Sequence, residues 1–319
     1  MPAITASAPG KIILCGEHAV VYGAPAIALP VFQVSTKTTI LARPTAAPGE
    51  VTIIAPCINL DDKLEALGDQ QPLKAAANLV KEELGLSRLQ ACEIRINSSI
   101  PLAAGLGSSA SVTVSMVRAL SQFLGHPLEP ETVNRIAFEV EKIHHGTPSG
   151  IDNTVITYQT PVFFRKDSPI EHLKIHHGFT LVIADSGTSI STAETVTGVR
   201  ERRQANRERY DDLISRIGEL SLEIRHILCT NDLLTSGDLL TKNHNLLIEL
   251  GVSTPMLDRL VNAALAAGAA GAKLSGGGGG GNIIAIVDPS MAAGLASSLE
   301  ENGAVRTIIT HMHAEGGIA

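Results

Sequence analysis

A glycine- and serine-rich stretch that leads directly into an apolar helical run is the feature that most constrains this chain. It reads Pro101-Leu102-Ala103-Ala104-Gly105-Leu106-Gly107-Ser108-Ser109-Ala110, and the helical pattern continues to about Leu124. Glycine permits a positive φ and a close approach of the backbone to a ligand, and Ser108 or Ser109 can cap the helix. The N–H groups and the positive dipole end at a helix N-terminus favour an anion, most often a phosphate. The stretch alone leaves open a simple tight turn with a serine N-cap.

Composition narrows the class of protein. The 319 residues are 44% hydrophobic and 18% charged, which indicates a folded core and room for two domains. The net charge of −7 and the 3% of aromatic residues disfavour nucleic acid and anionic membranes as partners. The cysteines are far apart without a C-x-x-C pair, so we expect neither a disulfide framework nor a zinc site. No signal segment and no membrane-length apolar run is evident, and we expect a cytoplasmic protein.

Two further glycine motifs flank the central one. The first runs from Pro9 to Gly23. The segment from Ile4 to His18 predicts a strand, a turn at Pro9-Gly10, and a buried strand that delivers Lys11, Glu17 and His18 to its end. The last begins at Lys273 and contains six consecutive glycines, Gly276 to Gly281, between two strand-like runs. Six glycines are entropically costly, so they indicate that the backbone passes very close to something, with a flexible linker as the alternative.

Candidate acidic and basic residues lie between these motifs. A helix is predicted from Glu129 to about His144, and Glu141 falls at the edge of its buried stripe, where it faces either a cleft or solvent. A turn-rich segment then presents Asp152, most simply as the N-cap of a short element. One long arginine-rich helix is predicted from Ala193 to about Arg209, as a solvated face or as the rim of a site for an anionic substrate. We place a domain boundary near residue 160, giving domains 1–160 and 161–319.

Taken together and in this order, the three glycine motifs resemble those of the GHMP small-molecule kinases, and they span almost the whole chain. Two stretches, Gly16 to Gly23 and His145 to Asn153, resemble the mevalonate kinase branch in particular. Galactokinases would be expected to follow Gly-Glu-His with Thr-Asp-Tyr, whereas this chain has Ala19-Val20-Val21, and phosphomevalonate kinases usually have Gly-Glu-Tyr.

The resemblance implies an α+β fold of two domains with the active site in the interdomain cleft. The N-terminal domain would resemble domain 2 of ribosomal protein S5, and the C-terminal domain would be ferredoxin-like. The implied activity is transfer of the ATP γ-phosphoryl group to the 5-hydroxyl of mevalonate, with Mg²⁺ as cofactor. Another GHMP acceptor, namely phosphomevalonate, a sugar or homoserine, and a non-catalytic nucleotide-binding protein are the alternatives. The resemblance is also compatible with a homodimer.

The resemblance assigns a role to each candidate residue. Asp152 would lie beside the acceptor hydroxyl, as a general base or as a group that only orients it, and Lys11 would be the cation close to it. Glu17, His18 and Gly278 would hold mevalonate. Glu141 would bind Mg²⁺ together with Ser109, with Ser108 as the alternative hydroxyl. The residues that would surround the ATP phosphates are Pro101, Ala104, Gly105, Leu106, Gly107, Ser108, Ser109 and Ala110.

Overall fold

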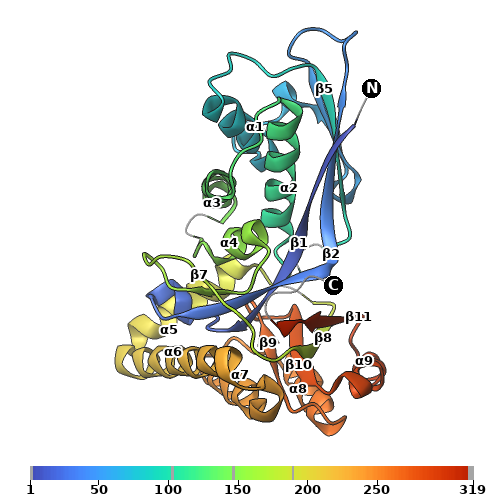
Figure 1. Ribbon diagram of the computed structural model, residues 1–319. Coiled ribbons are helices and arrows are strands. Elements are labelled where there is room, and N and C mark those ends of the chain that lie inside the picture. Colours follow the sequence, from blue (N-terminus) through green and yellow to red (C-terminus); the bar gives the residue numbers. More distant parts are fainter. Residues whose placement is uncertain (1–2, 102–103, 146–147, 189, 315–319) are drawn as a thin grey trace. The chain divides into compact units, whose positions relative to one another are not determined.

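The computed structural model in Figure 1 describes residues 3–101, 104–145, 148–188 and 190–314, which fall into two compact units. The first unit comprises Met1–Gly10, Val34–Pro101 and Gly107–Gln159. The second comprises Lys11–Gln33, Leu102–Leu106 and Thr160–Ala319. The chain thus passes from one unit to the other after Gln159, and residues 11–33 and 102–106 are grouped with the second unit. The division into domains 1–160 and 161–319 stays a prediction.

The first unit packs helices against one face of a sheet (Figure 1). Helix α2 is the central helix, because it contacts α1, α3, α4 and β5. Strands β3 and β5 are parallel, joined through a connection that contains α1, and β5 is antiparallel to β2. The elements are β1 (Ile4–Cys15), β2 (Ala26–Ala42), β3 (Val51–Ala55), β4 (Leu60–Lys63), α1 (Pro72–Glu83), β5 (Cys92–Ser98), α2 (Ser108–Phe123), α3 (Pro130–His145) and α4 (Ile151–Tyr158), with β1 and β2 continuing into the second unit.

Strand β1 corrects one prediction. The expected turn at Pro9-Gly10 is wrong, because β1 runs without interruption from Ile4 to Cys15, and Gly10 is not among the glycines with a positive φ. Among the described strands, β1 pairs with β2 and lies off the main path of the sheet. A strand in this position has backbone N–H groups that need no hydrogen-bond partner in the sheet. Proline, which lacks an N–H, can occupy such a position. The pairing with β2 therefore overrides the local turn signal.

The second unit contains a four-stranded antiparallel sheet in the order β11-β8-β10-β9. Its strands and helices follow one another as strand, helices, strand, strand, helix, strand, which is the ferredoxin-like arrangement and confirms that prediction. The elements are β6 (Val162–Phe164), β7 (Glu171–His172), β8 (Phe179–Asp185), α5 (Thr192–Ala205), α6 (Arg207–Thr230), α7 (Asp238–Glu249), α8 (Pro255–Ala266), β9 (Gly271–Ser275), β10 (Asn282–Val287), α9 (Ala292–Glu301) and β11 (Arg306–Met312).

The single arginine-rich helix predicted from Ala193 to about Arg209 is wrong. It is two helices that break at Asn206, whose side chain caps α6 by accepting a hydrogen bond of 3.2 Å from the backbone N–H of Arg209. Asparagine is a poor interior helix residue and a good N-cap. Arg202 donates to the carbonyls of Leu250 and Gly251 just after α7, at 3.2 Å each, so this arginine stabilises a helix end.

None of the helices in the described part of the chain combines the length and the apolar character required to cross a membrane.

Candidate active site

The glycine- and serine-rich stretch forms the N-terminus of α2, as predicted, but its cap differs from the prediction. Gly107 is the N-cap, with φ 74° and ψ 31°, and its carbonyl accepts from Ser111 N at 2.9 Å. The N–H groups of Ser108, Ser109 and Ala110 precede that first helical bond, so they have no partner within the helix ladder. The expected serine N-cap is wrong. Leu102 and Ala103, which belong to the same motif, lie outside the described residues.

The hydroxyl of Ser109 contacts Glu141 instead of capping its own helix. Ser109 Oγ donates to Glu141 Oε1 at 2.7 Å, and Glu141, which lies on α3, is only 5% exposed. The alternative of a solvated surface glutamate is therefore wrong. The contact with α3 explains the missing serine cap, because the same hydroxyl cannot serve both partners well.

This pair of oxygens fits a magnesium ion. Mg²⁺ takes few protein ligands at about 2.1 Å in an octahedron, so neighbouring ligand oxygens lie roughly 3 Å apart. The 2.7 Å between Ser109 Oγ and Glu141 Oε1 is close to that spacing. No group of three or more His, Cys, Asp or Glu residues that could hold a metal occurs among the residues described. The site therefore suits an ion that completes its shell with water and phosphate oxygens.

Asp152 is the second residue of α4, so its predicted role as an N-cap is wrong. The cap is Gly150, with φ 91° and ψ 0°. Asp152 is half-buried, and its carboxylate belongs to the first turn, where the helix dipole favours negative charge. Gly146 and Thr147, which precede it in the sequence, lie outside the described residues.

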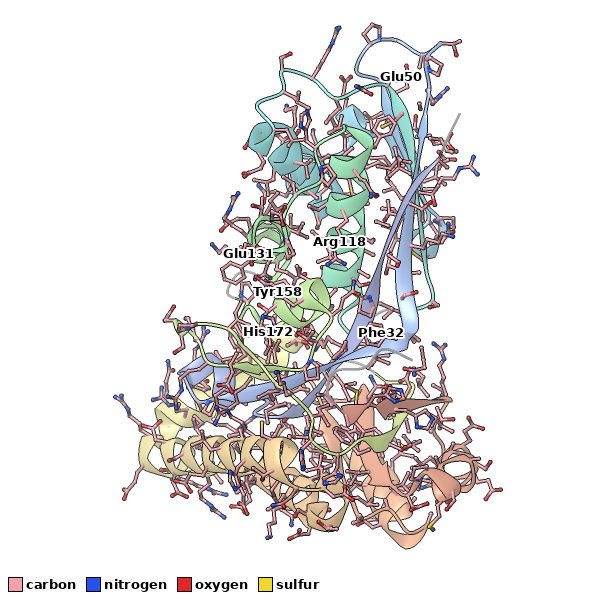
Figure 2. All side chains as sticks on the ribbon, in the orientation of Figure 1. Phe32, Glu50, Arg118, Glu131, Tyr158 and His172 are labelled. Carbon is pink, nitrogen blue, oxygen red and sulfur yellow. The ribbon has the colours of Figure 1, made fainter. Side chains whose placement is uncertain are left out.

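Hydrogen bonds tie the three helices that carry these groups together. Asn153, next to Asp152, donates to Asn134 Oδ1 on α3 at 2.6 Å. Arg118 of α2, labelled in Figure 2 with Tyr158, donates to the carbonyl of Thr157 in α4. The first unit therefore holds Ser109, Glu141 and Asp152 on mutually anchored helices.

In the second unit, the first part of the glycine- and serine-rich stretch is held through two backbone carbonyls. The N–H of Lys11, a buried residue of β1, donates to the carbonyl of Leu106 at 3.0 Å. The carbonyl of Ala104 accepts from Asn282 Nδ2. Asn282 was missed by the sequence analysis, because a side-chain bond to a residue so distant in sequence leaves no local pattern.

Glu17 forms a buried ion pair that the sequence analysis did not foresee. Its Oε1 accepts from Lys273 Nζ, and the two side chains are 1% and 0% exposed. Lys273 Nζ also donates to the carbonyl of Leu274 at 2.6 Å, whereas Glu17 Oε2 is buried without a hydrogen-bond partner. Burial raises the pKa of Glu17, and the Lys273 ammonium opposes that shift. The sequence signal that could have revealed this ion pair is Lys273, a charged residue inside the apolar strand β9.

His18 lies on the same loop, in a backbone conformation with φ 58° that is uncommon for residues other than glycine. Its Nε2 donates to the carbonyl of Gly277 at 2.8 Å. Burial lowers the pKa of His18 to about 4, although the bond to Gly277 opposes this. The imidazole is therefore neutral at pH 7, with its proton on Nε2.

The glycine run belongs to the packed structure, which excludes the flexible-linker alternative. Gly278 has φ 71°, and a Cβ there would lie 2.2 Å from the carbonyl oxygen of Val252. A Cβ on Gly280 would lie 2.4 Å from the carbonyl oxygen of Thr188. The close approach predicted for the run is thus made, in the second unit, to the backbone of the protein itself.

Comparison with known proteins agrees with this arrangement. Residues 71–160 match the family description "GHMP kinases N terminal domain", and residues 224–305 match "GHMP kinases C terminal". The mevalonate kinase of Thermococcus sibiricus is 35% identical over 333 aligned residues, which cover 98% of this chain and 97% of that protein.

Solved structures give the same result. The crystal structure of Methanococcus jannaschii mevalonate kinase matches with a TM-score of 0.83 at 27% identity and 98% coverage of both chains. L. major mevalonate kinase in complex with R-mevalonate matches with a TM-score of 0.82 at 28% identity, covering 98% of this chain and 97% of that one. The predicted α+β fold of two domains is confirmed, and the chain belongs to the GHMP kinase family.

Proposed function

We infer that the chain is a mevalonate kinase, which transfers the γ-phosphoryl group of ATP to the 5-hydroxyl of mevalonate and gives 5-phosphomevalonate and ADP. This reaction belongs to the mevalonate pathway of isoprenoid biosynthesis. The observation that carries the kinase chemistry is the contact of Ser109 with Glu141 at the N-terminus of α2, directly after the glycine loop. The choice of mevalonate is supported by relatives of nearly full length that are mevalonate kinases.

Phosphoryl transfer depends on positioning and on neutralising negative charge rather than on covalent chemistry. The N–H groups of Ser108, Ser109 and Ala110, at the positive end of the dipole of α2, supply donors for the ATP phosphates. The remaining loop residues, Pro101 and Ala104 to Gly107, would shape the backbone around them.

Ser109 and Glu141 would hold the magnesium ion. When bound, Mg²⁺ neutralises charge on the phosphates and orients them. We favour Ser109 over Ser108 as the hydroxyl ligand because Ser109 Oγ already lies 2.7 Å from the Glu141 carboxylate.

We assign the acceptor hydroxyl to Asp152 and Lys11. The half-buried Asp152 carboxylate would accept the proton of the hydroxyl or orient it, and Lys11 would add positive charge near the transferred group. His18, neutral and fixed by Gly277, together with Glu17 and Gly278, would hold mevalonate. The homodimer stays a prediction.

The test is ADP release from Mg·ATP in a coupled assay, with mevalonate, phosphomevalonate, galactose and homoserine in parallel. Selective turnover of mevalonate is the expected result. Turnover of another alcohol would support the phosphate site but refute mevalonate as the substrate. No ADP release with any of the four would refute kinase activity on these acceptors.

A further inference from the structure

Asn282 directly follows the six glycines and begins β10. Its side chain is buried at 2% exposure, and its Nδ2 donates to the carbonyl of Ala104 in the phosphate loop. Both residues belong to the second unit. A buried amide thus connects the end of the glycine run to the loop that precedes α2.

The position of Asn282 is fixed on both sides. In the sheet, it pairs with Asp185 of β8 and with Ser275 of β9, so it starts an inner strand. The preceding Gly281 donates its N–H to Thr188 O at 2.6 Å and accepts from Ser186 N at 2.9 Å. The amide therefore extends from a rigid part of the sheet.

The bond to Ala104 determines where the next N–H group points. In a trans peptide, the carbonyl of one residue and the N–H of the next lie in one plane and point in opposite directions. Because Asn282 holds the Ala104 carbonyl, the N–H of Gly105 points away from Asn282. The Leu106 carbonyl, held by Lys11 N, aims the N–H of Gly107 away from β1 in the same manner.

We propose that Asn282 is a positioning residue of the nucleotide site, which fixes the Ala104–Gly105 peptide so that the N–H of Gly105 faces the ATP phosphates. This inference depends on the proposed function. Gly105 is exposed, whereas the residues on either side of it, Ala104 and Leu106, are buried. Gly105 is thus exposed between two buried residues whose carbonyls are held by hydrogen bonds.

The role requires a hydrogen-bond donor at position 282. Asn282→Leu has a similar size but leaves the buried Ala104 carbonyl without its partner, so the peptide is free to reorient. We expect the Kd for ATP, measured by calorimetry, to rise about tenfold, as the loss of one hydrogen bond in a buried site predicts. The KM for mevalonate should stay within about twofold, since the side-chain amide of Asn282 bonds the Ala104 carbonyl and not a residue assigned to mevalonate.

Asn302→Leu is the matched control. Asn302 also donates its Nδ2 to a backbone carbonyl of the second unit, that of Ser298 at 2.8 Å, but in α9 and not in the phosphate loop. This variant should lower the melting temperature without changing the Kd for ATP.

Asn282→Asp gives a readout that a merely structural role would not produce. When protonated, the introduced carboxyl can donate to the Ala104 carbonyl, and when ionised it repels it. Burial without a paired cation raises the pKa of the introduced carboxyl. The ratio of the variant's KM for ATP to that of the wild type should therefore exceed one wherever the carboxyl is ionised, and should rise with pH across its titration between pH 4 and pH 9. This second variant keeps the test decisive if Asn282→Leu does not fold.

The outcomes are distinct. Wild-type protein that does not bind ATP would refute the proposed function itself. Wild-type binding together with an unchanged Kd in Asn282→Leu, or a KM ratio that stays near one from pH 4 to pH 9 in Asn282→Asp, would overturn the assignment of Asn282.

Discussion

Replacement of Lys273 by methionine should destabilise the protein relative to wild type by more at pH 7 than at pH 5. Lys273 is the partner of Glu17, and the two side chains are 0% and 1% exposed. Methionine has a similar length but no charge, so Lys273→Met removes the paired cation from the buried Glu17 carboxyl, whose Oε2 has no hydrogen-bond partner in the native protein. Lys11 exerts only a smaller attraction on that carboxyl. A buried carboxyl without a cation is expected to take up a proton rather than remain ionised.

The cost follows from the pKa. An unfolded glutamate has a pKa near 4.5, so keeping the carboxyl protonated at pH 7 costs about 3.5 kcal/mol, at about 1.4 kcal/mol for each pH unit, and at pH 5 only about 0.7 kcal/mol. The first value agrees with the roughly 3–5 kcal/mol seen when one partner of a buried ion pair is removed. In the variant, the folded state binds a proton at Glu17 that the unfolded state has lost, so the stability lost relative to wild type grows with rising pH in this window.

The assay is urea denaturation followed by circular dichroism at pH 5 and pH 7, for wild type, Lys273→Met and the double variant Lys273→Met/Glu17→Gln. The neutral amide removes the titrating group, so the double variant should lose the pH dependence and recover most of the stability at pH 7. The reasoning is refuted if the single variant loses less than about 1 kcal/mol at pH 7, or if its loss is equal at both pH values.

Three further predictions concern the active site and the buried histidines. Asp152→Asn should lower kcat roughly 10²- to 10⁴-fold while calorimetry shows an unchanged Kd for ATP; wild-type turnover would remove Asp152 from the mechanism. Ser109→Ala should raise the Mg²⁺ concentration for half-maximal activity roughly tenfold. Ser111→Ala should not, because Ser111 lies on the same helix but its hydroxyl donates to the Ala8 carbonyl in β1; equal effects would argue against Ser109 as a ligand. The folded pKa values of His18 and His244, lowered to about 4 by burial, mean that only the unfolded chain takes up these protons below pH 6.5. Stability should therefore fall from pH 6.5 toward 4, by about 2 kcal/mol for each histidine at pH 5, and His18→Asn should reduce that slope in urea denaturation; an unchanged slope would contradict the pKa of His18.

Much of the fold could be predicted because the signals are local. The glycine loop followed by an apolar run predicted the start of α2, and the resemblance to the GHMP kinases implied the ferredoxin-like unit. The order of three glycine motifs indicated the family. Each single motif is made of residues that are neighbours in the sequence.

The errors arise where a tertiary contact outweighs a local preference. Ser109 is a good N-cap by type, but Glu141, which lies 32 residues further along the chain, takes its hydroxyl. Pro9-Gly10 favours a turn, but pairing with β2 keeps it in a strand. Pairs such as Glu17 with Lys273, or Asn282 with Ala104, are separated by 256 and 178 residues, and no periodicity connects them.

The most direct test of the central claim is the fate of the γ-phosphoryl group. The protein would be incubated with Mg²⁺, mevalonate and ATP labelled in that group, and the product examined by mass and by phosphorus NMR. The account predicts that the label appears in a monophosphate whose phosphorus couples to the two protons of the C5 methylene, because the 5-hydroxyl is primary and the other hydroxyl is tertiary. Label found only in inorganic phosphate, or in an ester without that coupling, would contradict it.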